Sequence, residues 1–213
     1  MNLYEKHRPT TFEEVIGQGR AVNQIRRIIE RGWGGQAFWL SGASGTGKTT
    51  IARIIAGIGA DEFCIDEYDS ADRLDYAALD KIERELALYG WGKGGRAIIV
   101  NEAHGLRALT VRRLLGLLER IPHHVVWIFT TTREGEQKLF DDQMDASPLL
   151  SRCIEVRLTN QGLCKPFAER AQTIARAEGL DGKPLSAYET LAKSCKNNMR
   201  MMLQQIAAGV MAE

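Results

Sequence analysis

Two patterns of apolar residues alternate along most of the chain. Short, nearly continuous apolar runs are typical of strands buried on both faces, and they occur at residues 36–41, 63–66, 97–100 and 125–130. Residues 153–158 alternate between apolar and polar positions, which predicts a fifth, peripheral strand. Between these runs, apolar residues recur at the i, i+3, i+4 spacing of an amphipathic helix, over residues 47–58, 74–88 and 110–120. Strands that alternate with helices predict an α/β fold, in which a five-stranded parallel sheet carries helices on both faces.

The pattern changes after residue 158. No strand-like run follows, and helical spacing appears over residues 162–177, 185–193 and 198–211. We therefore predict two domains. The first is an α/β core formed by residues 1–158, and the second is a small all-helical domain formed by residues 159–213.

Composition excludes several classes of protein. The 213 residues are 44% apolar, and 28 basic residues face 27 acidic ones, for a net charge of +1. A disordered chain would be poorer in apolar residues and further from neutrality. The apolar runs are far shorter than the ~18 residues of a membrane helix, and the charged first nine residues do not resemble a secretory signal. Near-neutral charge means that any surface for nucleic acid must be a local one.

The cysteines carry no metal or disulfide pattern. The four residues are Cys64, Cys153, Cys164 and Cys195, and no two of them form a CxxC pair. Such scattered cysteines argue against a zinc site and against a disulfide framework, and they fit a reducing cytoplasm. The four tryptophans, including Trp91, are expected to serve in packing.

Residues 42–49 form the strongest motif of the chain, Gly-Ala-Ser-Gly-Thr-Gly-Lys-Thr. The motif matches the phosphate-loop pattern G-x-x-x-x-G-K-[ST], and it lies between a predicted strand and a predicted helix, as that pattern requires. Backbone N–H groups and the helix N-terminus then point at phosphate oxygens. Lys48 is expected to reach the phosphates and the Thr49 hydroxyl to bind Mg²⁺. The predicted nucleotide contacts in this segment are Gly42, Ala43, Ser44, Gly45, Thr46, Gly47, Lys48, Thr49 and Thr50.

A second motif follows the predicted strand at residues 97–100, where the chain reads Asn101-Glu102. Phosphate-loop ATPases need two acids here, one for the Mg²⁺ shell and one to activate the attacking water. Glu102 is predicted to be the general base, although a surface or helix-capping carboxylate is the alternative. Asn101 is predicted to accept a bond from Mg²⁺-bound water without the charge of an acid, so we expect weak Mg²⁺ binding and slow hydrolysis.

Four stretches carry a resemblance to a known family. They are residues 4–18, with Arg8-Pro9 and Gly17-Gln18, residues 114–132, with the pattern L-L-x-x-L-E-x-x-P, residues 150–153, Leu-Ser-Arg-Cys, and residues 198–203. With these stretches the chain resembles the AAA+ ATPases, and among them the ATPase subunits of sliding-clamp loaders. The resemblance implies a phosphate-loop AAA+ core with a helical lid, ATP and Mg²⁺ as cofactors, and ATP hydrolysis as the reaction.

The resemblance also implies roles for single residues. Arg8, Pro9 and Ile16 would pack on the adenine. Thr132, with Thr131 as the neighbouring option, would help to place the attacking water.

The resemblance also implies catalytic roles for two arginines. Arg152 would act in trans as an arginine finger on ATP held by an adjacent subunit, and Arg200 would contact the phosphates from the lid. A solvated strand-edge arginine and a helix-surface arginine are the respective alternatives.

Partners follow from the same resemblance. They would be other AAA+ clamp-loader subunits, the sliding clamp and primed DNA, whose phosphates Arg73 and Arg107 would contact. A solvated helix face that pairs with acidic residues is the alternative for these arginines. The sequence ends soon after the predicted lid, so we expect assembly to rest on core interfaces or on another polypeptide. Two other functions stay open: an ATP-gated scaffold subunit that barely hydrolyses ATP, suggested by Asn101, and a branch-migration ATPase, against which the Ser-Arg-Cys stretch argues.

Overall fold

The computed structural model describes residues 2–132 and 146–212, without the side chains of residues 146 and 147. Within these residues lies a five-stranded parallel sheet with the order β2-β3-β4-β1-β5. The strands are β1 (Gln36–Ser41), β2 (Ala60–Tyr68), β3 (Gly95–Val100), β4 (Val125–Thr131) and β5 (Ile154–Arg157). The α/β prediction is confirmed, and each predicted strand is present, with β2 longer than expected.

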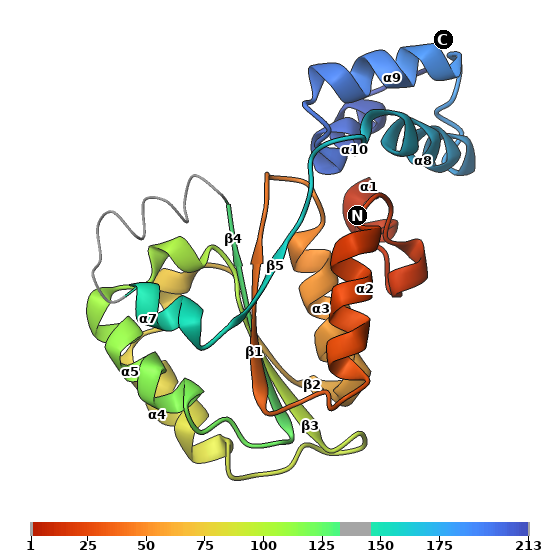
Figure 1. Ribbon diagram of the computed structural model, residues 1–213. Helices are drawn as coiled ribbons and strands as arrows, with labels where there is room; N and C mark the ends of the chain where they lie inside the picture. The colour runs from red at the N-terminus through yellow and green to blue at the C-terminus, as the bar shows by residue number, and fades with distance from the viewer. Residues whose placement is uncertain (1, 133–145, 213) are drawn as a thin grey trace.

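Helices cover both faces of the sheet (Figure 1). One face carries α2 (Gly19–Ile29) and α3 (Lys48–Gly59), and the other carries α4 (Tyr76–Glu85), α5 (Ala108–Leu118) and the short α7 (Ala146–Ser151). Three 3₁₀ turns complete this part: η1 (Phe12–Glu14), η2 (Ala71–Arg73) and η3 (Ala103–Gly105). The pattern of apolar residues did not predict α2, α7 or the N-terminal helix α1 (Leu3–Lys6).

The strand pleat explains the two-sided core. Side chains alternate between the faces of a strand, so Trp39 packs with the α4 and α5 side, whereas its neighbours Phe38 and Leu40 pack with α2 and α3. All three are fully buried. The central strands therefore carry apolar residues at successive positions, which is the pattern that made them visible in the sequence.

The last three helices, α8 (Cys164–Ala177), α9 (Leu185–Ser194) and α10 (Met199–Ala207), share a separate cluster of buried residues. Leu3 and Tyr4 of α1 and Ile16 pack against the same cluster. The N-terminal segment thus lies next to the C-terminal helices (Figure 1). The division into two domains at residue 159 stays a prediction. None of the described helices combines the length and apolar content needed to cross a membrane.

Candidate nucleotide-binding site

The phosphate loop connects β1 to α3 at the carboxyl edge of the sheet. Gly47 is the N-cap of α3 and has a φ of 98°, a left-handed conformation that favours glycine. The Lys48 side chain is buried, and its Nζ donates hydrogen bonds of 2.9 Å to the carbonyl oxygens of Gly42 and Ala43. The ammonium group and the start of α3 therefore face the same loop, an arrangement that suits an anion.

The loop also lies directly against the start of α10, one of the three helices α8, α9 and α10 that we call the lid. A Cβ atom on Gly45, which has a φ of 75°, would come within 2.1 Å of Asn198 Oδ1 and 2.9 Å of Asn198 Cα. Asn198 is the N-cap of α10, and its side chain accepts a hydrogen bond from the backbone N–H of Met201. Glycine at position 45 thus lets α10 begin in contact with the phosphate loop.

Gln18 joins this loop to the segment that leads into the lid. The side chain is 2% exposed. Its Nε2 donates to the carbonyl oxygen of Thr46 at 3.3 Å and to that of Thr159 at 2.9 Å, and its Oε1 accepts from the Thr159 N–H at 3.0 Å. One buried amide therefore fixes the position of residue 159 relative to the phosphate loop.

The other end of the loop meets β3 through Thr49. Its hydroxyl donates to Asn101 Oδ1 at 3.1 Å, and the Thr130 hydroxyl donates to the same oxygen at 2.9 Å. Asn101 Nδ2 donates in turn to Glu67 Oε1 at 2.8 Å. The two residues predicted to hold Mg²⁺ are thus brought together, and Glu67, which lies on the neighbouring strand, was not predicted.

The side-chain oxygens of Thr49 and Asn101 fit a magnesium ion that is bound mainly through the nucleotide. Mg²⁺ usually keeps several waters and takes few protein ligands beside substrate phosphates, and the side-chain oxygens of Thr49 and Asn101, 3.1 Å apart, have the chemistry suited to such ligands. In the described part of the chain no group of three His, Cys, Asp or Glu side chains could hold a metal ion by itself.

Glu102 follows Asn101 in an unusual backbone conformation. It has φ 51° and ψ 47°, a left-handed conformation that is uncommon for a residue with a side chain and is often found at functional sites. Its carboxylate is 49% exposed and lies 3.4 Å from His104 Nδ1. The same His104 nitrogen is 3.2 Å from the Thr131 hydroxyl at the end of β4. Glu102 is therefore half exposed and is linked to β4 through His104, close to the predicted position Thr132.

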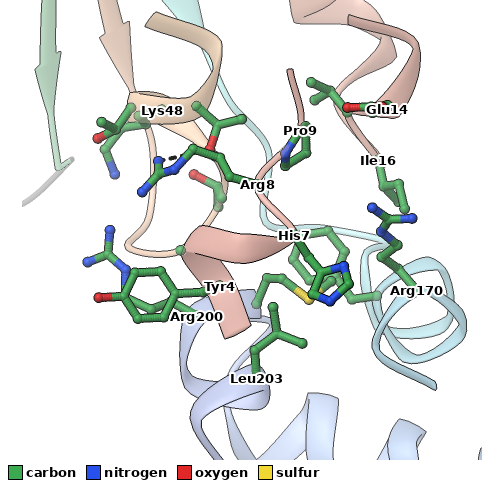
Figure 2. A pocket seen from close by; sticks show the side chains of 18 of the residues that line it. Tyr4, His7, Arg8, Pro9, Glu14, Ile16, Lys48, Arg170, Arg200 and Leu203 are labelled. Atoms are coloured by element: carbon green, nitrogen blue, oxygen red, sulfur yellow. Dashed lines mark hydrogen bonds between the residues drawn. The ribbon is translucent and has the colours of Figure 1, made fainter. Parts of the chain in front are cut away.

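A pocket extends from the phosphate loop to the lid (Figure 2). Apolar and polar side chains from three regions line it, namely the N-terminal segment, the loop and the last helices. All the predicted nucleotide contacts except Gly42 and Ala43 belong to the lining, and so do Glu102 and Arg200. Further lining residues that the sequence did not indicate are Tyr4, His7, Phe167, Arg170, Met199 and Leu203.

Two arginines of the pocket are held by neighbours. Arg8 donates to Thr50 Oγ1 at 3.3 Å and to Glu5 Oε2 at 3.1 Å, and this hydrogen bond lowers the pKa of Glu5. The Arg200 guanidinium lies over the Tyr4 ring at 5.4 Å from its centre, and both side chains are visible side by side in Figure 2. Arg200 therefore extends from the lid toward the N-terminal helix on the same side as the pocket.

Arg152 does not line this pocket. It follows α7, on the face of the sheet opposite α3, and its side chain is 29% exposed. Its guanidinium donates to the carbonyl oxygen of Pro148 at 2.9 Å and forms an ion pair with Glu119, which lowers the pKa of the Glu119 carboxyl. Arg152 is thus not brought to the phosphate loop of its own chain.

The predicted DNA contacts Arg73 and Arg107 are both exposed. Arg73 ends η2 and Arg107 precedes α5, and η2 and η3 contact each other, so the two arginines belong to adjoining turns. Arg73 lies 3.9 Å from Asp69. The pKa of Asp72 is lowered chiefly by a hydrogen bond with the Ser70 side chain and further by the charges of Arg73 and Arg107. Acidic neighbours therefore accompany this small basic surface.

A group of exposed apolar side chains lies at the opposite edge of the sheet, near the amino ends of β2 and β3. Trp91 is 81% exposed, so its predicted packing role is wrong. The loop that carries it is held against β2 by a 2.8 Å hydrogen bond from the Lys93 N–H to Asp61. We name this group the apolar end surface, and its members are Ile58, Phe63, Leu88, Tyr89 and Trp91.

Comparison with known proteins finds relatives in DNA replication. DNA polymerase III subunit tau of Escherichia coli (strain K12) is 28% identical over 233 residues, which cover 97% of this chain and 35% of that protein. DNA polymerase III subunit gamma/tau of Mycobacterium tuberculosis (strain ATCC 25618 / H37Rv) is 31% identical over 156 residues, which cover 62% of this chain and 27% of that protein. The chain thus spans roughly a third of the length of these curated relatives or less. No family model matches the chain.

Solved structures show the same fold. The RuvB Holliday junction branch migration motor of Thermotoga maritima superposes with a TM-score of 0.68 at 23% identity, over 94% of this chain and 64% of that one. A second RuvB structure from the same organism gives a TM-score of 0.71, also at 23% identity. At this identity the likeness concerns the fold alone.

Proposed function

We propose a function from the premise that this chain is a relative of the AAA+ ATPases of the sliding-clamp-loader family. It binds ATP with Mg²⁺ and hydrolyses the β–γ bond as one subunit of an assembly that loads a sliding clamp on primed DNA. The observation that carries the proposal is the phosphate loop, whose Lys48 and Thr49 line the pocket and whose Thr49 also donates a hydrogen bond to Asn101.

The phosphates would lie along the loop and the start of α3. Lys48 would neutralise their terminal oxygens, and backbone N–H groups of the loop would donate to them. The Thr49 hydroxyl and the Asn101 amide oxygen would hold Mg²⁺, which supplies charge neutralisation on the phosphate oxygens when it is bound. Glu102, which lines the pocket, would accept a proton from the attacking water.

The nucleoside would occupy the part of the pocket between the N-terminal segment and the lid. Apolar side chains such as Ile16, Phe167 and Leu203 suit the faces of a flat base. Arg200 would reach the phosphates from α10, so the nucleotide would touch the core and the lid at once. Binding would then influence the angle between them.

Arg152 would act on ATP held by a neighbouring subunit. A guanidinium that is always charged and delocalised suits the charge that spreads over a transferred phosphoryl group. Its position outside its own pocket supports this role in trans, and its ion pair with Glu119 would hold it ready on the surface. The proposal therefore requires an oligomer.

Two surfaces support contacts with DNA and a clamp. Arg73 and Arg107 on adjoining exposed turns would contact phosphates of primed DNA without reading its sequence. The apolar end surface would meet a protein partner, which we propose to be the sliding clamp, because such a contact would remove these exposed apolar side chains from water.

Steady-state ATP turnover, measured with and without primer–template DNA, tests the proposal. We expect turnover that rises on primed DNA and is lost in both Lys48→Ala and Arg152→Ala, whereas nucleotide binding is lost only in Lys48→Ala. Turnover that persists in Arg152→Ala would refute the role in trans. ATP binding without turnover under either condition would favour the second candidate, an ATP-gated scaffold subunit, to which the amide at Asn101 points.

A further inference from the structure

The orientation of the Asn101 amide is determined by its surroundings. A carboxylate accepts hydrogen bonds but donates none, so the amide nitrogen must face Glu67 Oε1, from which it lies 2.8 Å. The amide oxygen then faces the hydroxyls of Thr49 and Thr130, at 3.1 and 2.9 Å. A flipped amide would set an oxygen against the carboxylate. Asn101 is also 6% exposed, so water has little access to replace these bonds.

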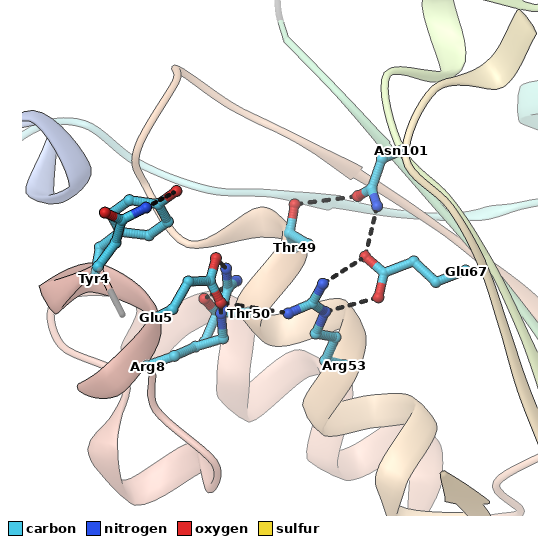
Figure 3. Close-up of polar contacts among 9 residues, drawn as sticks. Tyr4, Glu5, Arg8, Thr49, Thr50, Arg53, Glu67 and Asn101 are labelled. Atoms are coloured by element: carbon cyan, nitrogen blue, oxygen red, sulfur yellow. Dashed lines mark hydrogen bonds and ion pairs between the residues drawn. The ribbon is translucent and has the colours of Figure 1, made fainter. Parts of the chain in front are cut away.

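Glu67 is held in place from the other side. Arg53, one turn after Thr49 on α3, donates through Nε to Glu67 Oε2 at 2.7 Å and through Nη2 to Oε1 at 3.2 Å. Such a two-point pair restricts the carboxylate to one position. Figure 3 shows the resulting line of contacts, from Thr49 through Asn101 and Glu67 to Arg53, with Glu5 and Arg8 beyond it.

We propose that Glu67 is the positioning residue of the magnesium site, and that the carboxylate at 67 and the amide at 101 act as one unit. Glu67 presents the Asn101 oxygen to the metal side and provides the negative charge one hydrogen bond behind it. This inference rests on the proposed function, because it assumes that Mg²⁺ binds beside Thr49.

The pair explains why an acid at position 101 is unfavourable in this chain. In Asn101→Asp, a carboxylate oxygen would replace the amide nitrogen, which lies 2.8 Å from the Glu67 carboxylate. Like charges at such a distance repel strongly where solvent access is low. A negative charge is therefore favourable at position 67 or at position 101, but not at both. Exchanging the carboxylate and the amide between these two positions should preserve the hydrogen-bonded pair.

A four-member series tests this exchange: wild type, Glu67→Gln, Asn101→Asp and the double variant. The assay measures the affinity of a fluorescent ATP analogue in EDTA and as a function of Mg²⁺ concentration, together with the thermal midpoint without nucleotide. Asn101→Asp alone should lower the midpoint and should not tighten Mg²⁺-dependent binding. The double variant should recover the midpoint and bind Mg²⁺ about tenfold more tightly than Asn101→Asp, because the amide again faces a carboxylate.

A second comparison separates positioning from general damage. Glu67→Ala should raise the Mg²⁺ concentration for half-maximal binding about tenfold, with no change of affinity in EDTA. Glu67→Gln should recover only part of this loss, because its amide oxygen still accepts from Asn101 but its negative charge is gone. Glu62→Ala is the matched control, since Glu62 is exposed on the same strand.

Two results would overturn the inference. One is Asn101→Asp binding Mg²⁺ as tightly as the double variant, with additive midpoint changes, and the other is Glu67→Ala behaving like Glu62→Ala. Failure of the proposed function is distinguishable from either result, because the wild type would then bind no ATP analogue in EDTA or in Mg²⁺.

Discussion

Replacing Gln18 by alanine tests whether one buried amide holds the phosphate loop and the lid connection together. The side chain is 2% exposed and makes three hydrogen bonds, all to the backbone of Thr46 and Thr159. Residue 46 belongs to the loop and residue 159 follows β5, so the substitution removes their common partner without touching the motif itself.

The expected loss follows from the number of bonds. A hydrogen bond contributes about 1 kcal/mol net to stability, so three bonds give about 3 kcal/mol, reduced to about 2–3 kcal/mol because Thr159 is half-buried and water can reach it. For a chain of this size, that loss should lower the thermal midpoint by about 5–10 °C. Urea unfolding of the wild type and Gln18→Ala measures the difference directly.

Gln24→Ala is the matched control for this substitution. Gln24 is exposed on α2 and donates one bond, of 2.9 Å, to the carbonyl oxygen of Glu155. We expect it to cost about 1 kcal/mol or less. If Gln18→Ala cost no more than Gln24→Ala, the buried amide would not hold the two segments, and the reasoning would be refuted.

The remaining predictions concern surface charge. Replacing Arg73 and Arg107 with alanine should flatten the plot of log DNA affinity against log salt concentration by about one unit for each phosphate that is no longer neutralised, and an unchanged slope would show that neither arginine binds DNA. Lys6 and His7 lower the pKa of Glu178 at the end of α8. Their interaction with Glu178 therefore stabilises the fold above the pKa of this carboxyl in the unfolded chain, about 4.3. The stabilisation is lost as the pH falls through the lower pKa of Glu178 in the folded protein. The thermal midpoint of the wild type should therefore fall more steeply below about pH 4.3 than that of Glu178→Gln, and parallel curves would contradict the link.

The strands could be predicted from the sequence because a strand that is buried on both faces contains few polar residues. β3 and β4 lie inside the sheet and consist of apolar runs, and both were predicted within two residues of their ends. β2 lies at the edge, where Asp61 and Glu62 are tolerated, so only its apolar middle was recognised. β5 was predicted to be peripheral, and it lies at the other edge.

Helix α2 was missed although it is amphipathic. Ala21, Val22 and Ile25 are its buried residues and follow helical spacing. Most residues of α2 are polar, however, and its few apolar residues do not form a run, so the apolar pattern did not predict this helix. Helix α1 has four residues, too few for a periodic pattern.

The site was predictable where its residues follow one another in the chain. The phosphate loop and Asn101-Glu102 are local motifs next to predicted strands, so their meeting at one sheet edge could be expected. No local motif indicated that Gln18 and Glu67 contact residues of the site. Their roles depend on contacts with Thr159 and Asn101, which are distant in sequence. From the sequence alone, a buried amide or an ion-paired carboxylate cannot be distinguished from a polar residue on the surface.

The packing of α1 against the last helices has a consequence for how the chain is made and handled. Leu3 and Tyr4 emerge early in synthesis, whereas α8, α9 and α10, which share their cluster, emerge last. This cluster has high contact order and closes only after the sheet has been made. A bulky tag fused directly to the first residues would lie beside the lid and the pocket. Met211 is buried in the same cluster, so a tag on either side needs a long flexible spacer.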